Sequence, residues 1–179
     1  MMGLPQEMRT QRLYLRRPKP ADADAIFSRY ATDPEATRYL GWPRHRTLRQ
    51  TEAFLEFSDR EWSTKPGGPY LVFSPMGQLL GGTGLEFETE YRVVSGFVFA
   101  KDAWGRGYAT EVMKTMLSLA FAQPTVQRLY ALCHVEHLAS ARVLEKAGLR
   151  REGTLRRYLL FPNLPATLPS DVFCYAALR

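Results

Sequence analysis

Apolar residues recur with a helical period in three long segments of the chain. The strongest pattern follows Gly107 and gives one apolar face, formed by Ala109, Met113, Met116, Leu117 and Ala120. A second segment follows Thr47 and Gln50, whose spacing is typical of a capping box, and a third covers residues 138–147. Gly148, directly after the third segment, is typical of a helix C-terminus. These patterns predict three helices.

Shorter segments predict two further helices and a set of strands. Lys19-Pro20 opens one predicted short helix, and Asp33-Pro34, a cap followed by proline, opens the other. Apolar or alternating runs predict seven strands, at residues 13–16, 70–74, 79–87, 93–100, 128–133, 151–160 and 171–177. This order predicts a mixed α/β protein with antiparallel hairpins early and helical crossovers late. No long linker divides the chain, so residues 1–179 are expected to form a single domain.

The composition is that of an ordinary soluble globular protein, with 45% hydrophobic and 23% charged residues. No apolar run approaches the roughly 20 residues that span a bilayer, and residues 1–11 lack the apolar stretch of a signal peptide. We therefore expect a cytoplasmic location without membrane association. Cys133 and Cys174 lie in apolar, strand-like segments without metal-type spacing, which predicts reduced thiols and no metal site.

The net charge of +6 favours an anionic partner without naming it. A nucleotide cofactor, a nucleic acid and an acidic protein all fit, and so does a basic surface without a special role. Arginine and lysine residues are spread along the chain, and no nucleic-acid recognition motif is present, so nucleic acid is not expected as a partner.

A glycine turn lies between a predicted strand and the strongest predicted helix. Gly105 and Gly107 let the backbone approach a ligand closely, and the first turn of the helix offers free N–H groups at its positive dipole end. This arrangement suits a pyrophosphate. A turn that only makes a tight connection fits the same residues equally well.

Two blocks of sequence resemble a known superfamily. The run AWGRGYATE at residues 103–111 resembles the acetyl-CoA signature of the GNAT acetyltransferases. The run HLASARVLEKAGL at residues 137–149 is similar to a second block of the GNAT branch that contains the ribosomal-protein N-terminal alanine acetyltransferases. The runs TQRLYLR at residues 10–16 and YLGW at residues 39–42 also resemble this branch, so the resemblance covers nearly the whole chain.

The resemblance implies a fold and a reaction. The fold is the GNAT fold of the α/β (α+β) class, a mixed and mostly antiparallel sheet of about seven strands with about four flanking helices. The strands at residues 93–100 and 128–133 would be parallel and splayed, with the pantetheine arm of acetyl-CoA in the gap. An amine of a small molecule or a peptide would attack the thioester directly. The protein would be a monomer or a homodimer.

The resemblance also implies which residues hold acetyl-CoA. These are Phe97, Val98, Phe99, Trp104, Gly105, Arg106, Gly107, Tyr108, Ala109, Thr110, His137 and Ser140. His137 stands where the branch usually has asparagine, and its imidazole can still donate to or accept from the pantetheine amide. A surface histidine at a helix start is the alternative.

Two catalytic roles are implied for residues that depart from the usual pattern. Relatives often carry a glutamate base where this chain has Val94, which leaves Glu86 as the best nearby carboxylate, although a solvated surface position explains it too. The tyrosine that often protonates the thiolate is replaced by Leu144. The ribosomal branch instead places a serine at the position of Ser140, which is then the expected acid; a helix-capping serine is the alternative.

A weak base favours an acceptor amine of low pKa. An α-amino group has a pKa of about 7.7–8.0, so roughly a third of it is neutral near pH 7.5, against about one part in a thousand of a lysine. A polypeptide N-terminus and a small-molecule amine both remain open, as does a catalytically weak acyl-CoA-binding sensor of the same fold. Donors other than acetyl-CoA are not distinguished by the sequence.

Overall fold

The computed structural model describes residues 3–165 and 167–179 and contains a single eight-stranded sheet. The strands follow the order β1-β2-β3-β4-β5-β6-β8-β7 across it. Their bounds are β1 Glu7–Arg9, β2 Tyr14–Arg16, β3 Pro69–Phe73, β4 Leu79–Phe87, β5 Arg92–Phe99, β6 Arg128–His134, β7 Arg150–Leu159 and β8 Ser170–Leu178. The predicted sheet is thus confirmed with one strand more, because the three residues of β1 are too few to show an alternating pattern.

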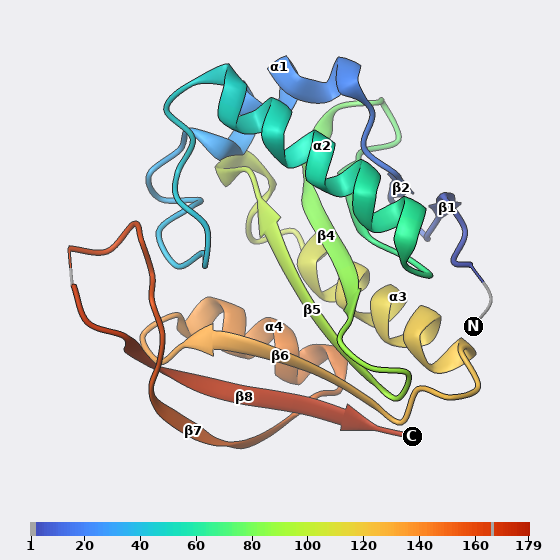
Figure 1. The fold of residues 1–179 in the computed structure, drawn as a ribbon, viewed down its shortest axis with the longest axis vertical. Helices are drawn as coiled ribbons and strands as arrows, with labels where there is room; N and C mark the ends of the chain where they lie inside the picture. The colour runs from blue at the N-terminus through green and yellow to red at the C-terminus, as the bar shows by residue number, and fades with distance from the viewer. Residues whose placement is uncertain (1–2, 166) are drawn as a thin grey trace.

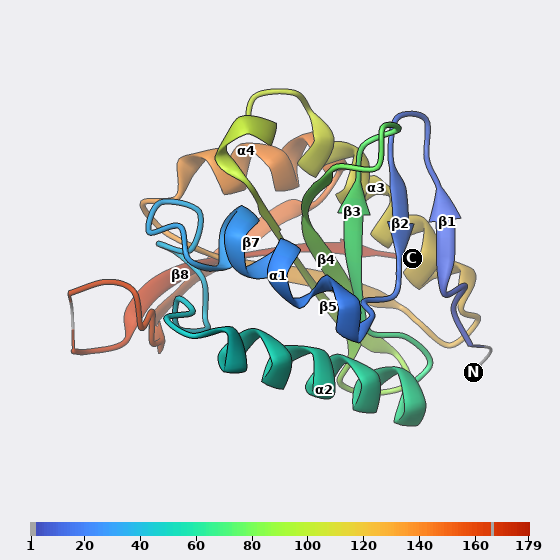
Figure 2. The same ribbon diagram turned by 90° about the horizontal axis from the view of Figure 1, so that it is seen from above.

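Helices cover both faces of the sheet (Figures 1 and 2). Helices α1 (Ala23–Ile26) and α2 (Leu48–Thr64) lie on one face, while α3 (Tyr108–Ala122) and α4 (Leu138–Ala147) lie on the other. The α3 and α4 bounds agree with the periodic pattern, and Gly148 ends α4 with a φ of 103°. The capping box of α2 forms as predicted, with the Thr47 N–H donating to Gln50 Oε1 at 3.2 Å.

The predicted helix at Asp33-Pro34 was wrong. Asp33 does cap the segment, because its Oδ1 accepts the N–H groups of Glu35 and Ala36 at 2.7 and 2.9 Å. Residues 34–39 nevertheless form only turns, and the chain leaves them at Gly41 and Trp42 before a full helix develops. The helix predicted after Pro20 is a composite of a 3₁₀ turn (Pro20–Asp22), α1 and a π turn, η2 (Phe27–Ala31).

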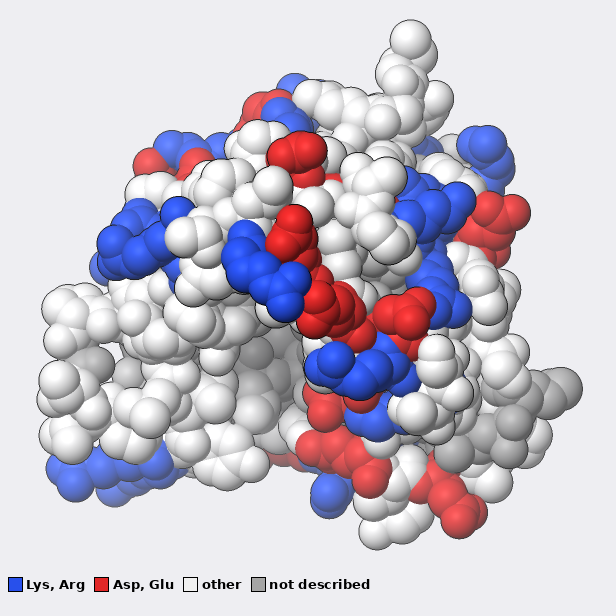
Figure 3. Space-filling model, turned by 45° about the horizontal axis from the view of Figure 1, so that its top comes forward, with Lys and Arg blue, Asp and Glu red and all other residues white. Residues whose placement is uncertain are grey.

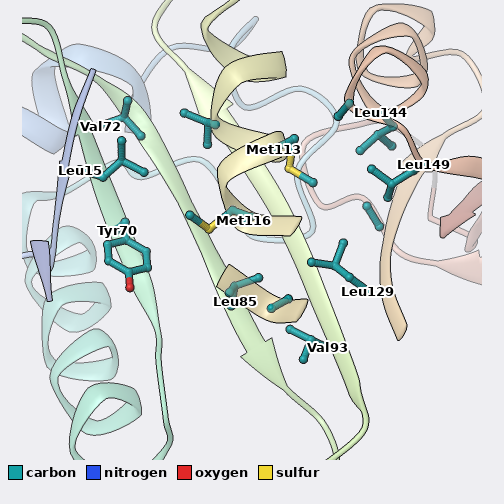
Figure 4. Close-up of a cluster of buried hydrophobic side chains, with 14 of the residues drawn as sticks. Leu15, Tyr70, Val72, Leu85, Val93, Met113, Met116, Leu129, Leu144 and Leu149 are labelled. Atoms are coloured by element: carbon teal, nitrogen blue, oxygen red, sulfur yellow. The ribbon is translucent and has the colours of Figure 1, made fainter. Parts of the chain in front are cut away.

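The larger core lies between α3 and the central strands (Figure 4). Met113 and Met116 of α3 are fully buried and lie against Leu85 of β4 and Val93 of β5. Truncating either methionine to alanine is expected to cost about 2–5 kcal/mol of unfolding free energy. This packing fixes the start of α3 relative to the end of β5, which is where the candidate site lies.

Strands β5 and β6 form a fork. They pair in parallel only through Arg92–Arg128, Val93–Leu129 and Val94–Tyr130. Beyond Val94 the two strands diverge, as Figure 1 shows, while β5 stays paired with β4 and β6 stays paired with β8. The splayed parallel strands predicted from the sequence are therefore present, and the second half of β5 has one edge without a strand neighbour.

Candidate active site

The glycine turn at the start of α3 is open to solvent. Gly105 and Gly107 have φ values of 72° and 77°, a conformation that residues with a side chain adopt at a cost. Gly107 is the N-cap of α3, so the N–H groups of its first turn lack partners within the helix. Residues 104–107 are exposed. This turn presents the backbone that the sequence predicted for a pyrophosphate.

A contact from the N-terminal segment braces this turn. Glu111 of α3 accepts hydrogen bonds from Thr10 Oγ1 at 2.6 Å and from Arg12 Nε at 2.7 Å. The Arg12 guanidinium also donates to the Arg106 carbonyl at 2.9 Å and lies over the Tyr108 ring. Burial alone would raise the pKa of Glu111, but the hydrogen bonds from Thr10 and Arg12 outweigh it and lower the pKa. Sequence reasoning missed this brace because its partners are about a hundred residues apart.

Phe97, Val98 and Phe99 lie in the part of β5 that has no strand neighbour on one edge, and their contact with a pantetheine arm stays a prediction. One backbone group there is already used, because the Trp104 indole N–H donates to the Phe99 carbonyl at 2.7 Å. Trp104 therefore ties the end of β5 to the glycine turn while nearly half of its surface stays exposed, at 47%. Asp102, between the two, pairs with Arg29 at 2.8 Å.

A cavity of about 430 Å³ lies beside the fork, on the face covered by α1 and α2. We call it the apolar cavity. Its lining residues are Ile26, Tyr30, Leu40, Trp42, His45, Phe54, Phe57, Pro69, Tyr70, Leu71, Gly82, Thr83, Gly96, Phe97 and Val98. Gly96, Phe97 and Val98 belong to β5, so the cavity reaches the strand along which the acyl donor is predicted to lie.

The titratable groups that line the apolar cavity are uncharged near neutral pH. Burial raises the pKa of the Tyr30 and Tyr70 hydroxyls, and burial lowers the pKa of His45 below its usual 6.5. His45 Nδ1 lies 2.8 Å from the Thr51 hydroxyl, which holds the imidazole in place. Sequence reasoning missed His45, since a loop histidine gives no periodic signal.

Ser140 lies near the open end of the fork, beside the C-terminal end of β6. It is buried on α4, and its hydroxyl contacts the thiol of Cys133 on β6. Burial raises the pKa of Cys133 to about 11, an effect that the Ser140 contact partly opposes. Cys133 is therefore a neutral thiol. Ser140 stands on the α4 side of β6, and its predicted role as the acid stays a prediction.

His137 precedes helix α4, but its side chain does not cap the helix and lies against Tyr39 instead. Its ring stacks on Tyr39 with centroids 4.8 Å apart, and Tyr39 also stacks on His134 at 4.9 Å. Burial lowers the pKa of His137, and the neighbouring His134 lowers it further. A neutral imidazole at this place keeps the donor and acceptor capacity predicted for a pantetheine contact.

Glu86 lies outside the lining of the apolar cavity. It pairs with Val94 across β4 and β5, and because side chains alternate, Val94 shares its face with Gly96 and Val98. Glu86 is thus on the cavity's face, about 7 Å further along the strands than Gly84, the partner of Gly96. Its side chain is exposed. Glu88 is engaged elsewhere, by Arg92 at 2.7 Å and by the Tyr130 hydroxyl at 2.7 Å.

The C-terminal arm, the segment between β7 and β8 that contains Asn163, holds the loop that forms one wall of the cavity. The Asn163 amide donates to the carbonyls of Thr37 and Trp42 at 2.7 and 2.9 Å and accepts from the Arg44 N–H at 2.7 Å. Trp42 and His45 both belong to this loop and line the cavity. From the sequence, residues 162–169 are expected to lie beside the substrate mouth or in a dimer contact, and residue 166 lies outside the described residues.

A forked sheet with a glycine turn at the head of one helix is the architecture of an acyl-CoA-dependent acyltransferase. The comparisons agree, since residues 12–150 match the family model described as "Acetyltransferase (GNAT) domain". That match spans most of the chain. The protein therefore belongs to the GNAT family of acetyltransferases, enzymes that take the acetyl group from acetyl-CoA.

Individual proteins are similar over nearly their full length. The uncharacterized N-acetyltransferase YoaA of Bacillus subtilis (strain 168) is 28% identical over 161 residues, which cover 88% of this chain and 90% of that protein. A GNAT-family acetyltransferase from Bacillus anthracis superposes with a TM-score of 0.80 at 25% identity, covering 96% and 98% of the two chains. The ribosomal-protein-S5-alanine acetyltransferase of Vibrio fischeri superposes with a TM-score of 0.80 at 14% identity, covering 96% of each chain, and shares the fold.

The described residues were also compared with the requirements of a membrane span and of a metal site. Within residues 3–165 and 167–179, no helix is both long enough and apolar enough to cross a membrane. The same part of the chain holds no group of three histidine, cysteine, aspartate or glutamate side chains arranged to bind a metal ion.

Proposed function

We propose that this protein transfers the acetyl group of acetyl-CoA directly to a primary amine, on a small molecule or at a polypeptide N-terminus. The observation that carries the proposal is the fork. The unpaired edge of β5 lies between the open glycine turn and the apolar cavity, so it borders both a donor site and an acceptor site.

On the donor side, the N–H groups from Gly105 to Ala109 would hold the pyrophosphate, with Arg106, Tyr108 and Thr110 around it. The backbone groups of Phe97 that face the fork would pair with the pantetheine arm beside Val98, and His137 and Ser140 would approach it from the β6 side. The positive φ of Gly105 and Gly107 and the exposure of this turn support this placement.

On the acceptor side, the neutral amine would enter from the apolar cavity. Its nitrogen forms a bond to the thioester carbonyl carbon, the carbon–sulfur bond breaks, and the sulfur leaves as a thiolate. An N–H group of β5 would stabilise the charge that develops on the carbonyl oxygen. Ser140 would protonate the thiolate, while the proton lost by the amine passes to water or to Glu86.

Steady-state turnover tests the proposal and its acceptor preference. CoA thiol release is measured at pH 7.5 with a peptide that has a free N-terminus and with the same peptide blocked at its N-terminus but carrying a lysine. The proposal predicts turnover with the free α-amine and at least tenfold lower kcat/KM with the blocked peptide, because so little of the lysine is neutral. Acetyl-CoA binding without turnover of any amine would instead support a sensor of the same fold.

A further inference from the structure

The chemical character of the residues that line the apolar cavity indicates which acceptor amines would fit it. The reaction class alone does not indicate this. None of the cavity's lining residues, all of them within the described part of the chain, is aspartate, glutamate, lysine or arginine. Figure 3 shows one face of the exterior, on which charged side chains gather in clusters separated by uncharged surface. A second charge on a bound acceptor would therefore lose its hydration without meeting a counter-ion.

The depth of the cavity shows how much of an acceptor would be enclosed. Phe57, at the rim, is 44% exposed, whereas Ile26, Tyr70 and Leu71 are each at most 1% exposed. The volume of about 430 Å³ is within the range of small-molecule sites. The walls thus suit an apolar body of the size of one aromatic side chain or somewhat larger.

One polar group is aimed into this apolar space. The Tyr30 side chain is only 3% exposed, and its hydroxyl forms no hydrogen bond with another described residue. The hydroxyl oxygen is not among the fully buried side-chain atoms without a partner, so it is accessible from the cavity. A methyl group built on Gly82 would lie 3.3 Å from that hydroxyl oxygen, which places the hydroxyl beside Gly82 in the cavity lining. By contrast, the Tyr70 hydroxyl already donates to the Pro5 carbonyl at 2.7 Å. The Tyr30 hydroxyl is therefore free to form a hydrogen bond with a polar atom of a ligand in the cavity.

We propose that the acceptor is a small primary amine whose body is uncharged and mostly apolar, held in this cavity with the Tyr30 hydroxyl as a hydrogen-bond partner. The inference rests on the proposed acetyl transfer and names its substrate class. It disfavours polyamines, which carry further ammonium groups, and free amino acids, which carry a carboxylate. A polypeptide N-terminus is the competing occupant.

Amides of single amino acids test the proposal, because they share an α-amino group and differ in the body attached to it. We would measure kcat/KM for acetylation of L-phenylalaninamide, L-lysinamide, glycinamide and free L-phenylalanine. L-Phenylalaninamide is expected to exceed each of the others at least tenfold. A higher kcat/KM for L-lysinamide, for spermidine or for a peptide beginning with phenylalanine would overturn the proposal.

A matched pair of variants at the rim sharpens the test. Phe57→Glu introduces the missing carboxylate at an exposed position, and Phe57→Gln has nearly the same shape without the charge. The ratio of kcat/KM for L-lysinamide over L-phenylalaninamide is expected to rise at least fivefold in Phe57→Glu relative to Phe57→Gln. Equal ratios in the two variants would show that the charge of the cavity does not select the acceptor.

Tyr30→Phe tests the hydroxyl, with L-tyrosinamide and L-phenylalaninamide as the probe pair. The variant is expected to lose at least fivefold in kcat/KM for L-tyrosinamide, whose own hydroxyl can bond that of Tyr30, and little for L-phenylalaninamide. Equal effects on the two amides would count against a directed contact. Thermal unfolding with acetyl-CoA separates the two levels of failure. If acetyl-CoA stabilises the protein but L-phenylalaninamide neither turns over nor binds, the substrate class is wrong; if acetyl-CoA itself does not bind, the proposed function fails.

Discussion

At the residue scale, Glu111 links the protonation of one carboxylate to the shape of the glycine turn. Its pKa is lowered in the folded state, so its bonds to Thr10 and Arg12 stabilise the fold at any pH above the unfolded value of about 4.3. This stabilisation is lost as the pH falls through the lower, folded pKa.

Glu111→Gln is expected to lower the free energy of unfolding at pH 7 by roughly 1–3 kcal/mol, the usual contribution of hydrogen bonds to a charged group. The difference from the wild type is expected to shrink as the pH drops below about 4. Denaturant unfolding across this pH range measures it, with Glu90→Gln at an exposed position as the control. A constant difference at all pH values would show that ionisation of Glu111 is not responsible.

Kinetics can separate the proposed role of Ser140 from its packing. Ser140→Ala removes the hydroxyl near the predicted thiolate, so kcat is expected to fall about a hundredfold while the KM for acetyl-CoA changes little. Ser118→Ala on the exposed side of α3, whose hydroxyl donates to the Lys114 carbonyl at 3.1 Å, is the control. An unchanged kcat in Ser140→Ala would show that Ser140 does not act as the acid and serves only at the start of helix α4.

At the element scale, the chain contains a matched control for the glycine turn. Gly105 and Gly77 have φ values of 72° and 81°, and an added Cβ would meet no atom within 4 Å at either position. Alanine at each is expected to cost about 1–2 kcal/mol of stability. Only Gly105→Ala is expected to weaken acetyl-CoA binding, by at least tenfold in calorimetry; equal effects on binding would place the pyrophosphate elsewhere.

The C-terminal arm is expected to act on the acceptor alone. Asn163→Ala removes three hydrogen bonds to the loop that carries Trp42 and His45, so the KM for the amine is expected to rise about five- to tenfold. Asn163→Asp keeps the acceptor for the Arg44 N–H but sets a carboxylate oxygen against the Thr37 and Trp42 carbonyls, so its rise in KM is expected to be at least as large. Acetyl-CoA affinity stays unchanged in this account, and a parallel loss of acetyl-CoA binding would contradict it.

The elements that the sequence predicted well are those whose signals are local. Helix α4 has both a period and a terminal glycine, and its bounds were predicted to the residue. Strand β1 is too short for a period, and the cap at Asp33 starts a turn that tertiary packing does not extend. The glycine turn was recognisable because its residues are contiguous.

The acceptor side depends on contacts between distant segments, which explains why sequence reasoning missed much of it. Tyr30 belongs to a predicted apolar face, but nothing local shows that its hydroxyl reaches Gly82 on β4. His45 belongs to a loop that Asn163, far along the chain, helps to hold in place. The absence of charged residues from the cavity lining follows from which segments the fold brings together.

At the scale of the whole molecule, the fork divides the protein into two working halves. The strands from β1 to β5, with α1 and α2, form the half that contains the apolar cavity, and β6 to β8 with α4 form the other half. Their shared pairing ends at Val94–Tyr130, so a ligand in the fork contacts both halves. Binding there is expected to raise the stability of the entire fold.

Thermal unfolding with acetyl-CoA, and with ADP as the control, tests whether the glycine turn and the fork hold the acyl donor. Acetyl-CoA at about 100 times its Kd adds about 2.7 kcal/mol, which for a chain of this length raises Tm by roughly 5–11 °C. The account predicts a rise of that order with acetyl-CoA and a much smaller one with ADP, which lacks the pantetheine arm. No shift at millimolar acetyl-CoA would contradict the account, because neither the glycine turn nor the fork would then hold the donor.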